Sequence, residues 1–234
     1  MRRFGNPAHV PVLMIHGFRR SGWTFLPLLA DLSEQYHLIV LDLPGHGETA
    51  AEVPEAAPTF ETFVEAVEVV RAQLGIARWT LLGHSMGGTV AGLYAARHPE
   101  RCAGVILLES TPKYRGWAKT TDCQDCPALV TDEGIAVLND AVHGAQSYRD
   151  IWEEYEAADA TPLFADRSLP VLWVMNTDDR ITRAHFERLA ADLSPDVMSH
   201  VRLETVYRKG HFIHWTATQQ VRDMISGFLR DVVR

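Results

Sequence analysis

Short apolar runs alternate with longer amphipathic stretches along the 234 residues of the chain. The short runs predict strands at residues 10–15, 37–43, 79–83, 103–109, 170–175 and 200–206. All but the last are apolar at nearly every position, which is typical of parallel strands that helices cover on both faces. The longer stretches predict helices at about 22–33, 60–75, 86–98, 183–193 and 217–232. This alternation favours an α/β fold with a doubly wound, mostly parallel sheet of about six strands.

One segment, residues 112–168, breaks the alternation. It contains no clear strand, but it includes an amphipathic helical stretch at 147–158. Long insertions within a compact domain are often functional lids. We therefore predict a core formed by residues 1–111 and 169–234, with a helical lid inserted at 112–168. A helical pair without a function is the alternative.

The segment GHSMGG, residues 83–88, joins the predicted strand at 79–83 to the predicted helix at 86–98. A strand that turns directly into a helix makes a sharp corner, and Gly83 and Gly87 lack the Cβ atoms that would collide there. Ser85 would then project at the carboxyl end of the sheet, as in the nucleophile elbow G-x-S-x-G. The pattern predicts that Ser85 is a catalytic nucleophile. A glycine-rich turn with an incidental serine is the alternative.

A serine nucleophile that attacks an acyl carbon needs N–H donors for the oxyanion. One candidate is the backbone N–H of Met86, because the first N–H groups of a helix have no partner within it. The second is expected in the loop after the first strand, where Gly17 permits a close approach and the N–H of Phe18 faces the site. His16, at the end of that strand, is expected to have a structural role.

The base is expected to be a histidine late in the chain. His211 follows Gly210 just after the last predicted strand, so a loop end can carry it to the serine. His214 is a competitor at the approach to the final helix. We predict that His211 is the base.

The acid that orients the base is expected after the predicted strand at 170–175. Asp178 and Asp179 are neighbours there, and they must point in different directions, so one of them is expected to serve. Glu109, at the end of the strand at 103–109, is a further alternative. A carboxylate at any of these positions would hold the imidazole in the tautomer that the reaction needs.

Composition and charge narrow the range of possible binding partners. Hydrophobic residues make up 47% of the chain and charged residues 22%, which is ordinary for a globular protein. The net charge of −8 argues against nucleic acid or an anionic membrane surface as the main partner. No apolar run reaches the ~18 residues of a membrane span, and the run at 10–15 is shorter than the ~7–15 residues of a signal peptide's apolar region. We expect a cytoplasmic protein.

Cys123 and Cys126 have the spacing of half a zinc site or of a redox pair. No second close pair of cysteines or histidines accompanies them, and no strand leads directly into a helix at this point. We therefore expect two incidental thiols on a loop and no metal site.

These motifs together resemble the α/β-hydrolase superfamily over nearly the whole chain. They occur in the family's order: HGF at 16–18, DLPGHGET at 42–49, GHSMGG at 83–88, HPERCAGVILLES at 98–110, NTDDRIT at 176–182 and GHFIHW at 210–215. The resemblance implies that the acid stands three residues after the residue that closes the strand, Asn176 here, and so selects Asp179. It also implies that the family's usual first two strands are absent, because only nine residues precede the first predicted strand.

The resemblance further implies a serine hydrolase that cleaves a carboxylic ester, thioester or lactone of a small acyl substrate. Ser85, Asp179 and His211 would form the triad, Phe18 and Met86 would hold the oxyanion, and neither a metal nor an organic cofactor would be needed. The chain is similar to compact carboxylesterases. A monomer or a homodimer is expected.

The chain is also similar to the menaquinone-pathway succinyl-hydroxycyclohexadiene-carboxylate synthase. A lyase that uses the same triad for proton abstraction is therefore the alternative activity. Such a substrate carries several negative charges, so several arginines would have to converge near Ser85. The candidates are Arg19, Arg20, Arg115, Arg149, Arg167 and Arg180. A binding protein that has kept the fold without the chemistry would lack a member of the triad.

Overall fold

The computed structural model describes residues 1–18, 20–52, 58–113, 157–177, 193, 195–207 and 210–232. These residues form a seven-stranded sheet in the order β1-β3-β2-β4-β5-β6-β7. Neighbouring strands from β3 to β7 are parallel, and β1 runs antiparallel to β3. The strands are β1 (Arg2–Phe4), β2 (Val10–Ile15), β3 (Tyr36–Leu41), β4 (Trp79–His84), β5 (Cys102–Leu108), β6 (Val171–Asn176) and β7 (Val201–Val206).

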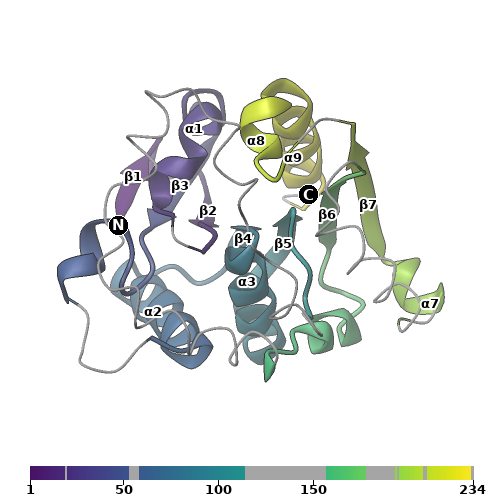
Figure 1. Ribbon diagram of the computed structural model, residues 1–234, viewed down its shortest axis with the longest axis horizontal. Helices are drawn as coiled ribbons and strands as arrows, with labels where there is room; N and C mark the ends of the chain where they lie inside the picture. The colour runs from purple at the N-terminus through teal and green to yellow at the C-terminus, as the bar shows by residue number, and fades with distance from the viewer. Residues whose placement is uncertain are drawn as a thin grey trace.

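Helices cover both faces of this sheet (Figure 1). The α-helices are α1 (Leu26–Ser33), α2 (Phe60–Gln73), α3 (Met86–Arg97), α7 (Pro195–Met198), α8 (Ile213–Thr216) and α9 (Thr218–Val232). Short 3-10 helices are η1 (Gly22–Phe25), η2 (Gly47–Glu52), η3 (Pro99–Arg101) and η4 (Thr161–Ala165). Among the described helices, none is both long and apolar enough to cross a lipid bilayer.

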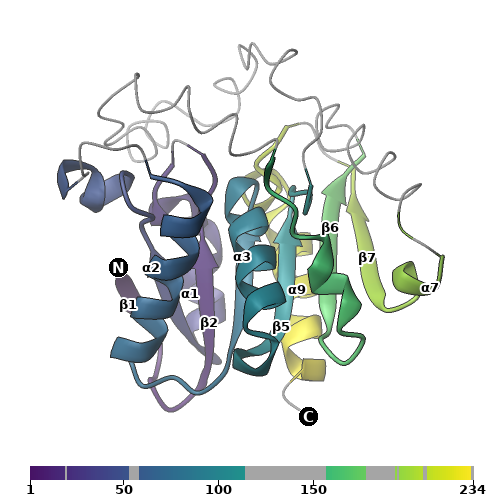
Figure 2. The same ribbon diagram turned by 90° about the horizontal axis from the view of Figure 1, so that it is seen from below.

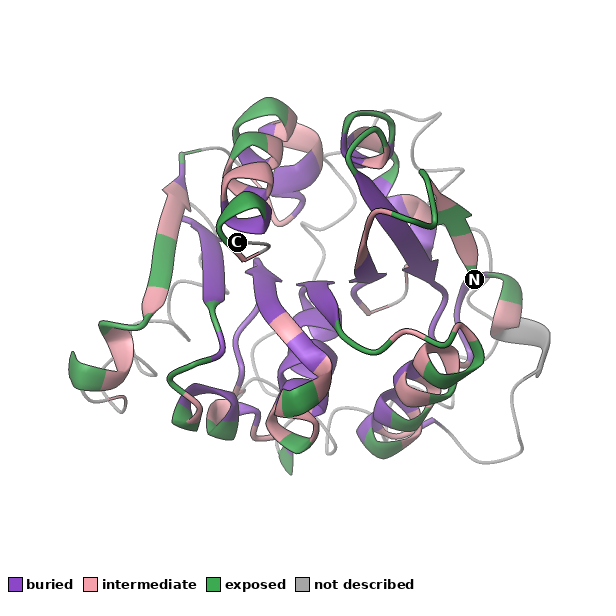
Figure 3. Ribbon diagram, turned by 180° about the vertical axis from the view of Figure 1, so that it is seen from behind, coloured by how far each residue is buried: buried purple, intermediate pink, exposed green. Residues whose placement is uncertain are grey.

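The alternation of side chains along β2 shows how the two layers are built. Leu13 and Ile15 pack with α2 and α3, whereas Val12 and Met14 pack with α1 and α9 on the opposite face. All four side chains are fully buried. Figure 3 shows the same burial along the other central strands, while the edge strand β7 is partly exposed. The predicted doubly wound parallel fold is confirmed.

Strand β1 differs from the sequence prediction, which placed no strand before residue 10. Its three residues, RRF, are too few to show any alternation, and they pair with β3, which lies more than thirty positions further on. Arg2 also forms an ion pair with the buried Asp42 just beyond the end of β3. This strand therefore depends on long-range pairing and on ion pairs of Arg2 with Asp42 and Glu48.

The described ends of the predicted insertion lie side by side. Lys113 and Asp159 form an isolated antiparallel bridge and an ion pair, and the N–H of Ala160 donates to the carbonyl of Pro112 at 2.8 Å. Helix η4 then packs on α3, where Leu163 approaches Gly92. Most of the predicted lid and the helix predicted at 183–193 lie outside the described residues, so both stay predictions.

Candidate active site

Ser85 occupies the corner between β4 and α3. Its backbone has φ 52° and ψ −121°, a conformation that costs energy for a residue with a Cβ and that clusters at functional sites. The N–H of Ser85 donates to the carbonyl of Leu108 at 3.0 Å, which holds the corner beside β5. A Cβ on Gly83 would collide with the carbonyl of Gly87, and a Cβ on Gly87 would collide with the carbonyl of Ile15. Close packing of backbone on backbone therefore makes the corner.

The segment after β5 braces the other side of this corner. The hydroxyl of Ser110 donates to the carbonyl of Ser85 at 2.7 Å, and a Cβ on Gly88 would overlap that hydroxyl. The indole N–H of Trp173 donates to the carbonyl of Ser110 at 2.7 Å. The carbonyl of Ser85 is thus held by Ser110, and Ser110 is held in turn by Trp173 of β6.

The loop after β2 lies against the serine. A Cβ built on Gly17 would come within 3.1 Å of the Cβ of Ser85, so the loop passes directly over the corner. Phe18 comes next, and its side chain packs against the core. Met86 is the first residue of α3, where backbone N–H groups are available to a ligand. Met86 directly follows Ser85, and Phe18 directly follows Gly17, whose backbone lies against Ser85; their role as oxyanion donors stays a prediction.

His16 holds that loop and is buried completely. Its Nδ1–H donates to the carbonyl of Gly17 at 2.8 Å, and its Nε2 accepts from the N–H of Leu43 at 3.0 Å. Burial, aided by the nearby His46, lowers the pKa of His16 to about 3. A neutral imidazole with both nitrogens bonded is structural, which agrees with the role expected for this residue.

Asp42, from the segment DLPGHGET, is a second buried anchor of the same region. Burial alone would raise the pKa of its carboxyl, but hydrogen bonds from the N–H groups of Gly22 and Glu48, together with Arg2, hold it below the usual value. The carboxylate thereby joins β3 to the loop before α1. This segment also supports the loop after β2, through the bond from Leu43 to His16.

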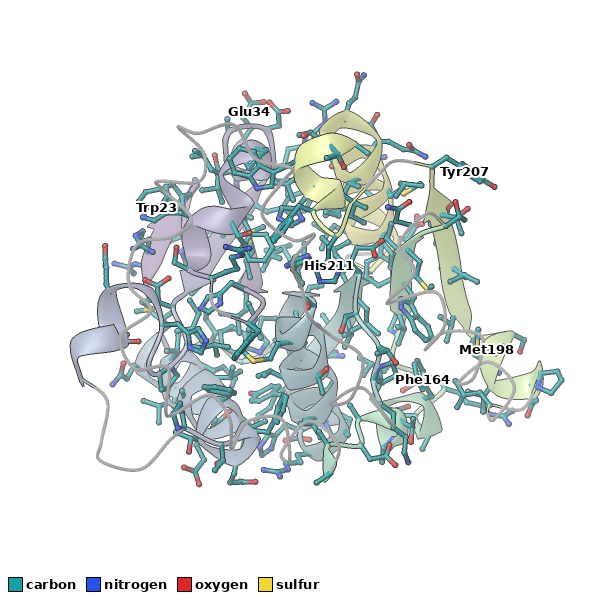
Figure 4. The ribbon with its side chains drawn as sticks, viewed as in Figure 1. Trp23, Glu34, Phe164, Met198, Tyr207 and His211 are labelled. Atoms are coloured by element: carbon teal, nitrogen blue, oxygen red, sulfur yellow. The ribbon has the colours of Figure 1, made fainter. Side chains whose placement is uncertain are left out.

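His211 lies in the loop between β7 and α8. Two long-range hydrogen bonds hold the backbone of this loop, one at His211 and one at Gly210. The Nε2–H of His84 donates to the carbonyl of His211 at 2.9 Å, and the side-chain amide of Asn176 donates to the carbonyl of Gly210 at 2.9 Å. Figure 4 shows His211 beside the start of α3, below α8. Because His84 directly precedes Ser85, its bond brings the predicted base to the same corner as the predicted nucleophile.

The surroundings of His214 do not favour it as the base. It is completely buried, and its Nε2 shares a hydrogen bond of 3.3 Å with the hydroxyl of Thr24. Burial and the nearby His211 lower the pKa of His214 to about 3. The side chain of His211, in contrast, is 18% exposed and can meet a substrate.

The predicted acid is not placed by the structure, because Asp178 and Asp179 lie outside the described residues. Glu109 is described: it directly follows β5, is fully buried and has its Oε2 4.0 Å from Nδ1 of His211. The carboxylate that sequence analysis named as an alternative therefore faces the predicted base.

Two of the six candidate arginines are described. The guanidinium of Arg20 lies over the ring of Phe212 at 5.0 Å, next to His211. Arg167 is exposed and forms an ion pair with Asp196. Across the described ranges no cluster of three or more metal-binding side chains occurs, and the Cys123–Cys126 pair falls outside them.

Three residues that sequence analysis did not assign a role support the site: His84, Ser110 and Asn176. Each is polar, buried and located at or just after the end of a central strand. That position is the available signal, since carboxyl ends of parallel strands gather at one edge, where α/β sheets bind ligands. Figure 2 shows the central strands pointing toward that common edge.

A strained serine on a strand–helix corner, with a histidine held beside it, defines the class of α/β folds that carry a nucleophile elbow. A family model described as alpha/beta hydrolase fold matches residues 10–141, more than half of the chain. The chain belongs to the alpha/beta hydrolase family.

Relatives and solved structures agree with this family. The chain is 35% identical to a serine hydrolase-like protein of Danio rerio over 105 residues, which cover 44% of this chain and 32% of that protein. It is 32% identical to monoacylglycerol lipase abhd6-B of Xenopus laevis over 111 residues, 44% of this chain and 32% of the lipase. The chain thus matches about a third of the length of these relatives.

Solved structures match over almost the whole fold. The enol-lactonase from Burkholderia xenovorans LB400 superposes with a TM-score of 0.79 and 22% identity over 98% of this chain and 95% of the lactonase. A thermophilic esterase from Thermogutta terrifontis superposes with a TM-score of 0.72 and 21% identity over 99% of this chain and 92% of the esterase. At this identity the likeness concerns the fold.

Proposed function

We propose that the protein is a serine hydrolase that cleaves a carboxylic ester, thioester or lactone of a small acyl substrate. The observation that carries the proposal is the hydrogen bond from His84 to the carbonyl of His211, because it joins the nucleophile corner to the base loop. The alpha/beta hydrolase family and its esterase, lipase and lactonase relatives support the same class of reaction. A carboxylesterase that needs no metal or organic cofactor is the specific form we propose.

The proposed reaction begins with transfer of the Ser85 hydroxyl proton to His211. The serine Oγ then attacks the acyl carbon, and the N–H groups of Phe18 and Met86 bind the oxyanion. The proton passes from His211 to the leaving oxygen or sulfur, which leaves an acyl-serine. Water attacks this ester while His211 takes its proton, and the acid product departs as Ser85 recovers its hydrogen.

Asp179 remains the proposed orienting acid, on the resemblance stated above. Its carboxylate would accept the Nδ1–H of His211 and stabilise the imidazolium that forms in each half-reaction.

The first experiment compares p-nitrophenyl acetate and p-nitrophenyl octanoate as substrates of the wild type and of Ser85→Ala. The variant is expected to lose at least roughly 10⁴-fold in kcat/KM, as removal of a serine nucleophile does in comparable triads. Ser199→Ala is the matched control, since Ser199 bonds only locally to Asp196 in the exposed segment after α7. Full activity in Ser85→Ala would contradict the proposal.

A second readout needs no knowledge of the natural acyl group. A fluorophosphonate probe should add a single phosphonyl group to the folded wild type, found by mass spectrometry on the peptide that contains Ser85. Ser85→Ala should stay unlabelled. A folded wild type that neither labels nor turns over the esters would direct attention to the lyase alternative.

A further inference from the structure

We propose that Glu109 is a positioning residue for His211, and that its carboxylate supports the Nδ1 edge of the imidazole alongside the proposed acid Asp179. This inference rests on the proposed function, because it concerns the base of that reaction. It assigns His211 two carboxylates, one from the end of β5 and one from the loop after β6.

The backbone turns sharply at Glu109. Its φ is 44°, in the left-handed region that a residue with a long side chain rarely adopts. The N–H of Glu109 donates to the carbonyl of Val174 at 3.0 Å, so the backbone of Glu109 still bonds to the neighbouring strand β6. Its side chain is fully buried. A strained backbone and a buried acid together indicate a position kept for a function.

The carboxylate faces the correct edge of the ring. Oε2 of Glu109 is 4.0 Å from Nδ1 of His211, the nitrogen that points away from a nucleophile bonded to Nε2. This distance is longer than a hydrogen bond, but such bonds are often long without substrate and shorten in the reacting complex.

Two other groups that the structure describes next to His211 carry no negative charge. The ring of His84 lies 4.9 Å from that of His211, and burial, with His214 and His211 nearby, holds the pKa of His84 well below its usual value. Arg20 stacks on Phe212, beside His211. Glu109 is the carboxylate at ion-pair distance from His211 within the part of the chain that the structure describes. It therefore favours the protonated ring formed when Ser85 gives up its proton.

The test is a double-mutant cycle of Glu109→Gln and Asp179→Asn. The probe is the fluorophosphonate, and the readout is the rate at which Ser85 is phosphonylated in the wild type, both single variants and the double variant. Glu109→Gln is expected to slow labelling about tenfold, part of the roughly 10²–10⁴-fold that general base catalysis supplies. The double variant is expected to lose more than the product of the two single losses, because each carboxylate partly replaces the other.

Two further readouts separate positioning from structure. With p-nitrophenyl acetate, Glu109→Gln should lower kcat and leave KM within about twofold, since the interaction is made in the transition state. The control Glu68→Gln removes a carboxylate on α2 that bonds Arg71 and Tyr94, and it should leave the labelling rate unchanged. Thermal unfolding of all variants establishes that each is folded when assayed.

The outcomes are distinct for the two proposals. If the wild type labels at Ser85 but Glu109→Gln labels at the wild-type rate, both alone and in the Asp179→Asn background, the role of Glu109 is overturned and the hydrolase proposal stands. If Ser85 does not label in the wild type, the hydrolase proposal fails first. A slowed rate in Glu109→Gln with an unchanged unfolding temperature supports the inference.

Discussion

The nucleophile corner and the histidine loop are held in different ways. Around Ser85, backbone packs directly on backbone, and glycines at 83, 87 and 88 leave no room for a side chain. Around His211, two side chains, His84 and Asn176, reach in from neighbouring strand ends to bond loop carbonyls. The corner comes from adjacent central strands, whereas the loop follows the edge strand β7.

The two regions have different requirements: the corner must hold Ser85 rigidly, whereas the loop must orient His211. The serine sits in a strained backbone conformation, and only dense surroundings hold such a conformation. The predicted base must exchange protons with more than one partner. A loop that is held at a few points is sufficient to orient it for this task. Variants at the corner should therefore affect folding first, and variants at the loop should affect catalysis first.

The largest effect expected from a single substitution is at the corner. Gly87→Ala would drive a Cβ into the carbonyls of Ile15 and His16, and neither backbone can yield without moving β2. We expect a loss of several kcal/mol, about 3 or more, as for overpacked or strained core positions. Urea unfolding followed by circular dichroism measures it. A Gly87→Ala protein as stable as the wild type would show that the corner is looser than described.

The next effect is a loss of stability in acid, shared by both regions. Burial lowers the pKa of His16 and of His214 to about 3, so both are neutral in the folded chain and become protonated on unfolding below about pH 6.5. The unfolded state then binds more protons than the folded state. As the pH is lowered, the free energy of unfolding therefore decreases by about 1.4 kcal/mol per pH unit for each imidazole. Between pH 6.5 and 4, the free energy of unfolding should drop steadily.

A variant checks that this slope comes from the buried histidines. His214→Phe, next to Phe25, removes one titrating ring and should make the dependence on pH shallower by about 1.4 kcal/mol per unit. An unchanged slope would assign acid sensitivity to other groups, such as the low-pKa carboxyl of Asp42.

A smaller effect is expected at the histidine loop. His84→Phe keeps an aromatic ring but removes the N–H that bonds the carbonyl of His211. Misplacing the base should lower kcat about tenfold or more, because small shifts of catalytic groups cost that much. Stability should change less than in Gly87→Ala. Unaltered kcat in a folded His84→Phe protein would mean that the loop is held by other contacts.

The smallest effect serves as a control for the glycine result. Gly227 lies within α9, and the nearest atoms to a Cβ there are 3.9 Å away. Gly227→Ala should stabilise the protein by up to about 1 kcal/mol, since alanine favours a helix. The measurement is the same urea titration. A destabilised Gly227→Ala protein would undermine the use of Cβ clashes as the explanation at Gly87.

Local patterns predicted most of the fold. The sequence pattern marked β2 to β7 to within about two residues. For β2 to β6 the reason is that strands covered on both faces are apolar almost throughout. Strand β1 was missed, since its pairing with β3 depends on contacts distant in the sequence. The corner at Ser85 was also predictable, because a Cβ on Gly83 would collide with Gly87, only four residues further along the chain.

The arrangement around His211 was less predictable. His84 and His211 are 127 positions apart, and no local pattern indicates that one will bond the carbonyl of the other. Glu109 was recognised as an acid at a strand end, but its approach to His211 depends on where the loop after β7 comes to rest. Such contacts follow from tertiary packing, which residue types alone do not encode.

The paired ends of the insertion have a consequence for how this protein could diversify. Lys113 and Asp159 pair with each other, so the two described ends of the insertion lie together. The entropy of closing such a loop grows slowly, by about 0.6 kcal/mol for each doubling of its length. Recombination could therefore exchange the enclosed segment for a longer or shorter one while Ser85 and its supports keep their places. The length of the insertion and the framework around Ser85 can therefore evolve separately.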